Sequence, residues 1–336
     1  MVLCGQRVSR EVDVGLPDGT RVTLPIAELE VRAGLPCAAV KKDAGDDPDV
    51  TDGCLVVATV TWSQSGEFTL RGGDGVGTVT KPGLQVPPGE PAINPVPRRM
   101  IRDAVLEVTD RPVEVTISIP GGEALADKTF NPRLGVQGGL SILGTSGIVR
   151  PFSSSALRDA LKCALNVAMA CGVHEPVFVP GRIGERAVRR LFQVAPEQVI
   201  EVSNEWGFML DQAVGCDFRE LLVLGHPGKL AKLAMGEWDT HSSRSRSAVP
   251  EVARMAEEKW GRPVPEVRTV EGLFAGLVEQ ERRDLGKELA VRIREAVLSR
   301  VHNKFDVAVV LVNISGALLG QDGDTSAWEE KSLPSA

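Results

Sequence analysis

Residues 131–151 read NPRLGVQGGLSILGTSGIVRP, and this stretch sets the architecture that we expect for the chain. One apolar run, LSIL at 140–143, is surrounded by the glycines Gly135, Gly138, Gly139, Gly144 and Gly147. Glycine loses much backbone entropy on folding, so this density indicates positive φ angles or close approach to a ligand. A short strand between glycine turns, followed by a helix, favours a crevice for an anionic or nucleotide-like ligand. The alternative is a tight structural crossover between domains.

Downstream of this stretch, short apolar segments alternate with amphipathic ones. The apolar segments predict strands at 177–179, 199–202, 221–224 and 307–312. The segments between them predict helices at 153–172, 185–192, 205–213, 228–235, 247–260 and 270–301. This alternation is typical of parallel strands, so we expect residues 126–320 to form an α/β domain with a mostly parallel, Rossmann-like sheet. Residues 321–336 have no period and predict a disordered tail.

Upstream of residue 126 the alternation of apolar and polar residues is typical of antiparallel strands. Alternating apolar residues on both sides of Pro17–Gly19 predict a β-hairpin over residues 8–30. Further strands are expected at 55–62, 68–70 and 113–119, with a helix that starts near Pro97. We therefore expect residues 1–125 to form an α+β domain with mainly antiparallel strands and two loops, one acidic and one rich in glycine.

Composition excludes several classes of function. The 336-residue chain is acidic, with net charge −7, and no basic run is interleaved with aromatic residues, so we expect no nucleic-acid partner. No apolar run approaches the ~20 residues of a membrane span, and the start lacks the apolar core of a signal peptide, so a cytoplasmic protein is expected. The six cysteines form no C-x-x-C pair, which favours reduced thiols and no dedicated metal site.

The loops that follow parallel strands all emerge at one edge of a sheet, where ligands bind. Four such loops contain glycine, and we expect them to converge there. Their candidate ligand-binding residues are Gly144, Thr145, Gly147, Gly181, Asn204 and Gly225. Glu201 ends the second strand of the series, where an acid commonly accepts hydrogen bonds from ribose hydroxyls. The alternative for Glu201 is an exposed acid at a strand end.

Three polar residues near this edge are candidates for direct roles. Lys229 lies in the first turn of a helix, where a cation is unfavourable, and this indicates an anionic ligand; the alternative is a solvated lysine. His226 follows a strand end and can act as a base or a donor. His241 can do the same, although the segment Thr240–Ser243 can also simply cap the next helix.

The acidic loop of the first domain, residues 41–53, reads KKDAGDDPDVTDG. Its spacing does not match a calcium loop. One interpretation is a solvated turn held by aspartate side chains. The other is a polar active-site loop, in which Asp47 is the candidate catalytic residue. Lys81 lies in the glycine-rich loop at 72–83 and can meet carboxylates.

Long motifs in this chain resemble those of the cobalt-precorrin-5B C-1 methyltransferase family, CbiD. The similarity covers roughly residues 10–320, and the motifs occur in one order: KKDAGDDPDVTDG, GGDGVGTVTKPGL, GEPAINPVPRRMI, NPRLGVQGGLSILGTSGIV, WGFML, LLVLGHPGKLAKLA and DTHS. The resemblance implies transfer of a methyl group from S-adenosylmethionine to ring carbon 1 of cobalt-precorrin-5B, giving cobalt-precorrin-6A, in the anaerobic cobalamin pathway.

The resemblance also implies a tetrapyrrole substrate with many carboxylates, and it implies that cobalt arrives inside that substrate. An acidic protein must then concentrate cations at the site, and our candidates are Arg133, Arg150, Arg182, Lys229 and Lys81. No metal or covalent nucleophile is needed, because a sulfonium is already a strong electrophile and rate can come from orientation. A homodimer is the expected assembly, if one forms.

The chain departs from the family pattern in two places. Family members usually begin with a glycine- and threonine-containing motif before an alanine-rich helix, and this chain starts downstream of it, so weak activity is one expectation. Asp52 stands where the family usually has His, which argues against an essential base there. A non-catalytic corrinoid carrier is therefore the main alternative function. A small-molecule kinase is a weaker one, because no G-x-x-x-x-G-K-[ST] motif is present.

Overall fold

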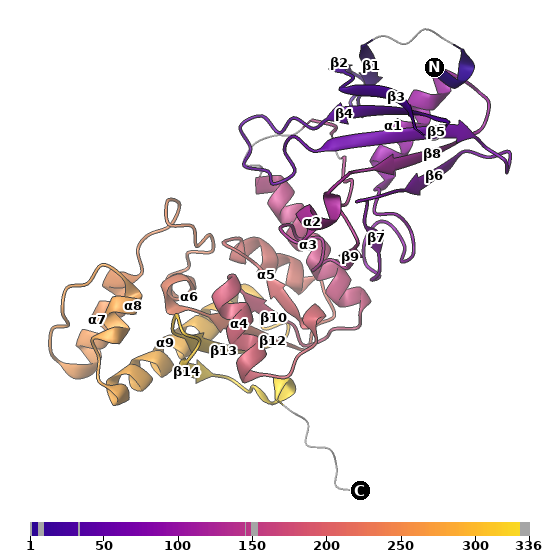
Figure 1. The fold of residues 1–336 in the computed structure, drawn as a ribbon. Helices are drawn as coiled ribbons and strands as arrows, with labels where there is room; N and C mark the ends of the chain where they lie inside the picture. Colours follow the sequence, from indigo (N-terminus) through magenta and orange to yellow (C-terminus); the bar gives the residue numbers. More distant parts are fainter. Residues whose placement is uncertain (1, 6–9, 33, 145, 149–153, 330–336) are drawn as a thin grey trace, which may run out of the picture. The chain divides into compact units, whose positions relative to one another are not determined.

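The computed structural model describes residues 2–5, 10–32, 34–144, 146–148 and 154–329 (Figure 1). The chain divides into two compact units, Met1–Ala156 and Leu157–Ala336. The sequence predicts this division at residue 125, with residues 126–156 in the second domain. In the structure these residues belong to the first unit, so the division lies later in the chain than predicted.

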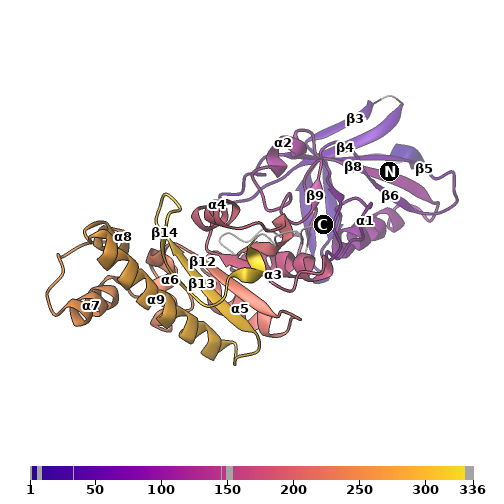
Figure 2. The same ribbon diagram turned by 90° about the horizontal axis from the view of Figure 1, so that it is seen from below.

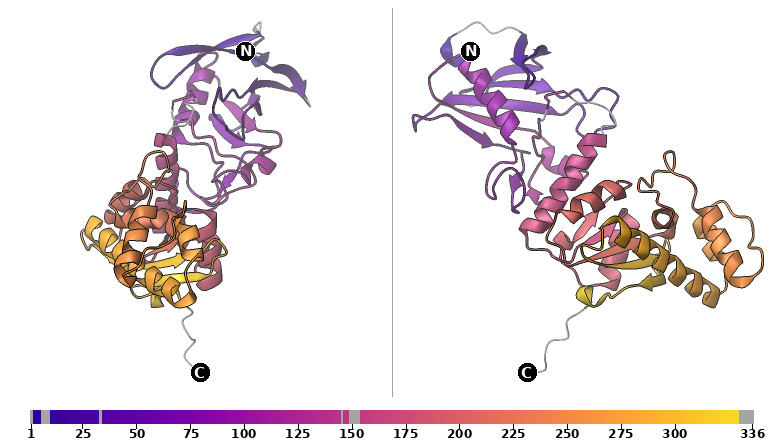
Figure 3. Two further views of the ribbon diagram at one scale, coloured as in Figure 1. Left: turned by 90° about the vertical axis from the view of Figure 1, so that its left-hand side faces the viewer. Right: turned by 180° about the vertical axis from the view of Figure 1, so that it is seen from behind.

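The first unit is built on a mainly antiparallel sheet, as the sequence predicts. The strand order is β3-β4-β5-β8-β6, with bounds Glu28–Arg32, Leu35–Lys41, Leu55–Trp62, Val113–Ser118 and Thr69–Gly72. Only β6 and β8 run parallel. Helix α1 (Pro95–Leu106) crosses one face of this sheet, where Ile101 and Val105 join the core formed with Val115 and Ile117 (Figure 3).

The predicted hairpin is confirmed as β1 (Glu11–Gly15) and β2 (Arg21–Pro25), which form a separate two-stranded sheet. Strands β3 and β4 are not predicted from the sequence. In β4 the buried residues are Cys37 and Ala39, small side chains with little strand signal of their own. Their pairing with β5, a long β-branched strand, decides their conformation.

Residues 131–144 lie within the first unit and pair with its other segments. Strand β9 (Val136–Gln137) pairs with β7 (Thr78–Val79), and Leu140 forms an isolated bridge with Val76. A Cβ atom on Gly139 would lie 2.3 Å from the carbonyl oxygen of Gly75, so two backbone segments touch where the side chain would be. Here the glycines bring chain segments together, which favours the structural crossover over a ligand cradle and moves the division of the chain to residue 156.

The second unit contains the mostly parallel sheet that the sequence predicts. The strand order is β11-β10-β12-β13-β14, with bounds Val199–Glu201, Val177–Val179, Glu220–Gly225, Asp306–Val312 and Leu318–Asp322. The first four strands are parallel, and β14 pairs antiparallel with β13. Because β11 and β12 lie on opposite sides of β10, the chain reverses its direction across the sheet between β10 and β12.

Helices cover both faces of this sheet. Helix α4 (Arg182–Leu191) packs on one face through Ala187 and Val188. The other face carries helices whose apolar residues form the largest core, and α9 runs along β13 and β14 (Figure 2). These helices are α3 (Ser154–Ala170), α5 (Trp206–Val214), α6 (Pro227–Ala234), α7 (Val249–Trp260), α8 (Val270–Ala275) and α9 (Glu279–Arg300).

One predicted helix, 270–301, is in fact two. The hydroxyl of Thr269 accepts a hydrogen bond from the amide of Gly272 and caps α8. This helix ends at Gly276, and α9 starts after the extended residue Val278. Residues 279–284, EQERRD, are mostly good helix formers, so the sequence does not mark this break.

The predicted disordered tail at 321–336 is wrong for the residues that the structure describes. Strand β14 continues to Asp322, and a 3₁₀ helix follows at Ser326–Trp328. Trp328 is fully buried among β10, β12, β13 and α4, and its indole nitrogen donates to the carbonyl oxygen of Glu175 at 2.9 Å. A single aromatic anchor in a polar segment has no period, so only tertiary packing reveals it.

We expect Trp328→Ala to lower the free energy of unfolding by about 3–5 kcal/mol, because it leaves a large cavity between the sheet and α4. Trp260→Ala, at the partly exposed end of α7, is the matched control and should cost much less. Urea unfolding of both variants measures the difference. A Trp328→Ala protein as stable as the unmodified chain would show that the C-terminal segment is not part of the core.

Candidate functional site

The candidate site lies where β10 and β12 end, at the point of reversal in the second unit. The chain leaves β10 toward α4 on one face and leaves β12 toward α6 on the other. A Cβ atom on Gly225 would lie 2.7 Å from Cδ of Pro180, so the two turns are pressed together at this edge. In doubly wound folds such a point of reversal forms the ligand crevice.

Gly181 and Glu201 meet at this edge. Gly181 has φ 152° and ψ −162°, a region that is essentially restricted to glycine. A Cβ atom built on Gly181 would lie 3.5 Å from Oε1 of Glu201, the last residue of β11. The carboxylate of Glu201 therefore stands beside the backbone of the turn after β10, the position that the sequence predicts for an acceptor of ribose hydroxyls.

Lys229 brings a positive charge to the same place. Its ammonium group is half-buried in the first turn of α6 and makes no hydrogen bond to the residues that the structure describes. Burial lowers the pKa of Lys229, the charge of Glu201 raises it in part, and Lys232 lowers it again. A half-buried ammonium group without a hydrogen bond, beside a carboxylate, is typical of a binding site.

Arg182 is the first residue of α4 and is exposed. Its guanidinium forms no hydrogen bond or ion pair with the described part of the chain. Like Lys229, it places a cation at the positive end of a helix, where an anion from outside is favoured instead. The two cations therefore flank the Gly181 turn and the Gly225 turn.

His226 is the N-cap of α6 in this structure. Its Nδ1 atom accepts a hydrogen bond from the amide of Gly228 at 3.0 Å, so Nε2 carries the hydrogen and donates to Glu271 at 2.6 Å. Both ring nitrogens are occupied, and a role as a base would require one of these bonds to break. The catalytic role of His226 stays a prediction, and capping is the function that the geometry supports.

Asn204 and His241 belong to one arrangement beside the end of β11. The Thr240 amide donates to the Asn204 carbonyl oxygen at 3.1 Å, and the Thr240 hydroxyl donates to Oδ1 of Asn204. Asn204 thus holds the segment 239–245 against the sheet edge. Within this segment Nδ1 of His241 accepts from the amide of Ser243, which leaves Nε2 with its hydrogen to donate elsewhere.

Other predicted residues belong to the first unit. Lys81 lies over Gly135, where a Cβ atom would be 2.5 Å from its Cγ, and the guanidinium of Arg133 lies 5.9 Å from the ring of Phe130. Gly144 and Gly147 have positive φ and pack against Pro97 and Leu16, which favours a structural role. Thr145 and Arg150 lie outside the described residues.

The acidic loop of the first unit is held by its own side chains. Asp43 accepts from the amide of Gly45 and Asp52 from the amide of Ala44, which agrees with a solvated turn. Burial alone would raise the pKa of Asp49, but the ion pair with Lys42 and hydrogen bonds from Thr51 outweigh it and lower the pKa. Asp47 is half-buried in this loop, and its amide donates to Ala44 at 3.2 Å. Its catalytic role stays a prediction.

Sequence reasoning missed an ionic cluster at the same edge of the second unit. Glu205, only 4% exposed, accepts from Nε of Arg158 at 2.7 Å and lies 3.7 Å from Nη2 of Arg244. The buried ammonium of Lys232 donates to the carbonyl oxygen of Thr240 and to the hydroxyl of Ser245. These residues lie far apart in the sequence, and no local signal joins them.

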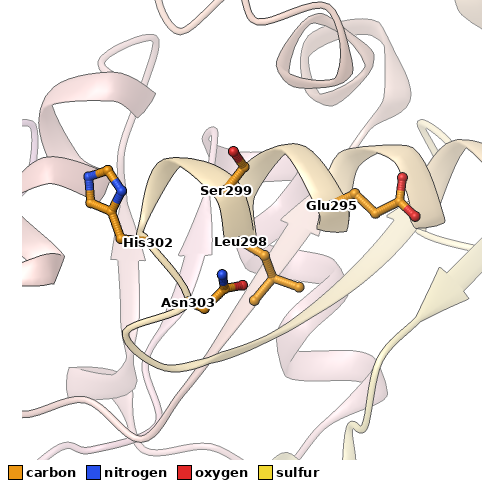
Figure 4. A pocket seen from close by; sticks show the side chains of 5 residues that line it. All are labelled: Glu295, Leu298, Ser299, His302 and Asn303. Carbon is orange, nitrogen blue, oxygen red and sulfur yellow. The ribbon is translucent and has the colours of Figure 1, made fainter.

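A surface hollow of about 520 Å³ lies beside the C-terminal end of α9, and Figure 4 shows the side chains that line it. It is lined by Glu295, Leu298, Ser299, His302 and Asn303, at the end of α9 and just beyond it. Because α9 leads into the start of β13, the hollow lies at the amino edge of the sheet, opposite the predicted crevice. It contains none of the predicted site residues.

None of the helices in the described ranges is both long and apolar enough to cross a membrane. Across the same ranges, no three His, Cys, Asp or Glu side chains are grouped so as to hold a metal ion.

Comparisons with known proteins agree on one family. The family model described as CbiD matches residues 1–151. A cobalt-precorrin-5B C(1)-methyltransferase of Syntrophotalea carbinolica is 53% identical over 328 residues, which cover 98% of this chain and 93% of the relative. A protein of the same name from Alkaliphilus metalliredigens is 39% identical and covers 92% of this chain and 84% of its own. A crystal structure of a cobalamin biosynthesis protein (cbiD) from Archaeoglobus fulgidus is 28% identical, with 74% and 76% coverage and a TM-score of 0.37.

The cap at His226 generates a prediction. We expect His226→Ala to lower the free energy of unfolding by about 1 kcal/mol, because the first turn of α6 loses its acceptor. His226→Asn should recover most of that loss, since asparagine is a good N-cap. Chemical denaturation of the two variants and the unmodified protein measures the effect. Equal stability of the Ala variant and the unmodified protein would contradict the capping role.

Proposed function

This chain belongs to the CbiD family of cobalt-precorrin-5B C(1)-methyltransferases, and we propose that it methylates ring carbon 1 of cobalt-precorrin-5B to give cobalt-precorrin-6A in anaerobic cobalamin biosynthesis. S-adenosylmethionine is the proposed methyl donor. The observation that supports this most directly is the convergence of Gly181, Glu201 and Lys229 at the point of reversal in the second unit.

The proposed donor site uses the edge formed by β11, β10 and β12. The carboxylate of Glu201 can accept hydrogen bonds from both ribose hydroxyls, since two vicinal donors suit one carboxylate. The backbone at Gly181 carries no side chain, so the donor can approach it closely. The ammonium of Lys229 has no hydrogen bond within the described residues and can bind the carboxylate of the donor.

For this reaction the main task of the protein is to orient the methyl donor and the ring carbon. The sulfonium of the bound donor supplies an activated methyl group, which leaves sulfur as ring carbon 1 forms the new bond. The residues of this chain then hold donor and ring carbon in line and exclude water. Rigid turns at the ends of buried strands suit this task, because β10 is fully buried and β12 is buried along most of its length, so the turns that follow them are held in place.

The substrate is the acidic partner in this proposal. Arg182 and Lys229 supply positive charge from the second unit, next to the proposed donor site. In the first unit Arg133 and Lys81 remain predicted contacts for substrate carboxylates. His241 can donate through Nε2 to an oxygen of the substrate, because its other nitrogen is held within its own turn.

We expect Glu201→Gln to weaken binding of S-adenosylhomocysteine by about 10- to 100-fold, since hydrogen bonds to a charged group contribute about 1.5–3 kcal/mol. Isothermal titration calorimetry with S-adenosylhomocysteine, the product of the donor, measures this affinity directly. The control is Glu258→Gln on α7, which removes a carboxylate far from the sheet edge.

Unchanged affinity in Glu201→Gln would remove Glu201 from the donor site. If the unmodified protein bound neither S-adenosylmethionine nor S-adenosylhomocysteine at millimolar concentration, the methyltransferase proposal would fail. The non-catalytic carrier would then be the better interpretation.

Lys229 should make the folded protein less stable than it would be without the charge. Its pKa is lowered in the folded state, so the stability cost is fully present below that pKa and disappears as pH rises toward the ordinary value for lysine. We therefore expect Lys229→Met to raise the midpoint of urea unfolding at neutral pH while it weakens donor binding.

The gain in stability should shrink in alkaline buffer, where the unmodified lysine is neutral in both states. Arg182→Met is the comparison, because an exposed cation carries little burial cost. A Lys229→Met protein that is less stable than the unmodified chain at neutral pH would show that its charge is compensated in the fold.

A further inference from the structure

The ionic cluster around Glu205 has a feature that its structural role does not explain. Glu205 is the N-cap residue of α5 and only 4% exposed, and a buried carboxylate needs close partners to offset its lost hydration. Nε of Arg158 provides one at 2.7 Å. This bond uses only the inner edge of the Arg158 guanidinium.

The outer edge of the same guanidinium has no hydrogen-bond partner among the residues that the structure describes. Neither terminal nitrogen of Arg158 makes a hydrogen bond to the residues that the structure describes, and its side chain is 50% exposed. The guanidinium also lies 5.3 Å from the ring centre of Phe208, which restricts its orientation. A planar group held on one edge and open on the other is arranged to receive a carboxylate with two parallel hydrogen bonds.

A second guanidinium points to the same carboxylate. Nη2 of Arg244 lies 3.7 Å from Oε1 of Glu205, and its Nε donates to Asp239 at 2.5 Å. The segment that carries Arg244 is held by the buried ammonium of Lys232, which donates hydrogen bonds to the carbonyl oxygen of Thr240 and the hydroxyl of Ser245. The loop therefore presents Arg244 from a supported backbone.

The location matches the proposed methyl donor site. Helix α3 leads into the start of β10, so Arg158, near its N-terminal end, lies at the carboxyl edge of the sheet. Glu205 lies four residues after Glu201 and at the same edge. A methyl acceptor must come within about 3–3.5 Å of the donor methyl group, so the substrate must extend over neighbouring parts of this edge.

We propose that Arg158, oriented by Glu205 and accompanied by Arg244, binds an acidic side chain of the tetrapyrrole substrate. This assignment rests on the proposed function and extends it to residues that hold the macrocycle. Arg158 contacts the carboxylate directly, and Glu205 is a positioning residue that aims the guanidinium.

The test uses a stable corrin as the probe. Cobyrinic acid carries free carboxylates on the ring, and its fully methyl-esterified form has the same ring without the charges. Binding of each to the full chain is measured by absorbance titration. S-adenosylhomocysteine binding is measured in parallel by calorimetry.

Arg158→Lys is the key variant, because lysine keeps the charge beside Glu205 but lacks the two-pronged edge. We expect it to bind cobyrinic acid about 10- to 100-fold more weakly, with unchanged affinity for S-adenosylhomocysteine and for the ester. Glu205→Gln should show a smaller loss of the same selectivity. The control is Arg254→Lys on α7, whose side chain is also 50% exposed in an ion pair but lies on another surface.

The two proposals fail in different ways. Equal binding of cobyrinic acid by Arg158→Lys and the unmodified protein would overturn the assignment of Arg158 and leave the methyltransferase proposal intact. A parallel loss of ester binding would also overturn it, because a carboxylate contact cannot affect the ester. If the unmodified protein bound neither corrin nor S-adenosylhomocysteine, the proposed function and this assignment would both fail.

Discussion

The parallel pairing of β10 with both β11 and β12 is the constraint on which the candidate site depends. These strands are short. Strands β10 and β12 are almost wholly buried, so their ends are held in place by packing on both faces. The connections from β10 and β12 leave toward opposite faces. That divergence places the turns at Gly181 and Gly225 side by side at one edge, and the close approach of Pro180 to Gly225 keeps the two turns together.

Two of the charged side chains at this edge are buried and hydrogen-bonded, and do not pair on the surface. Glu205 and Lys232 are buried polar groups that hold neighbouring elements together through hydrogen bonds. Lys229 differs from both, because it is half-buried and has no hydrogen bond in the described part of the chain. A fold tolerates such a group at a cost in stability, and functional sites are where that cost is usually found.

Glycines serve different purposes in the two units. In the first unit Gly75 and Gly139 allow backbone segments to touch, which fixes the crossing of residues 72–83 and 131–148. In the second unit Gly181 adopts a conformation restricted to glycine at the end of a buried strand. Both patterns look alike in the sequence, because a glycine that faces protein backbone and one that faces a ligand obey the same steric rule.

The sequence by itself determined the elements whose signal is local. Apolar runs such as 177–179 and 307–312 predicted the parallel strands, the turn at Pro17–Gly19 predicted the hairpin, and the long motifs predicted the family. Tertiary structure alone decided the division at residue 156, the packing of Trp328 and the meeting of Arg158 with Glu205. Each of these depends on contacts between residues far apart in the chain. Such contacts leave no period or spacing in the sequence, because their partners are selected by the packing of the whole unit.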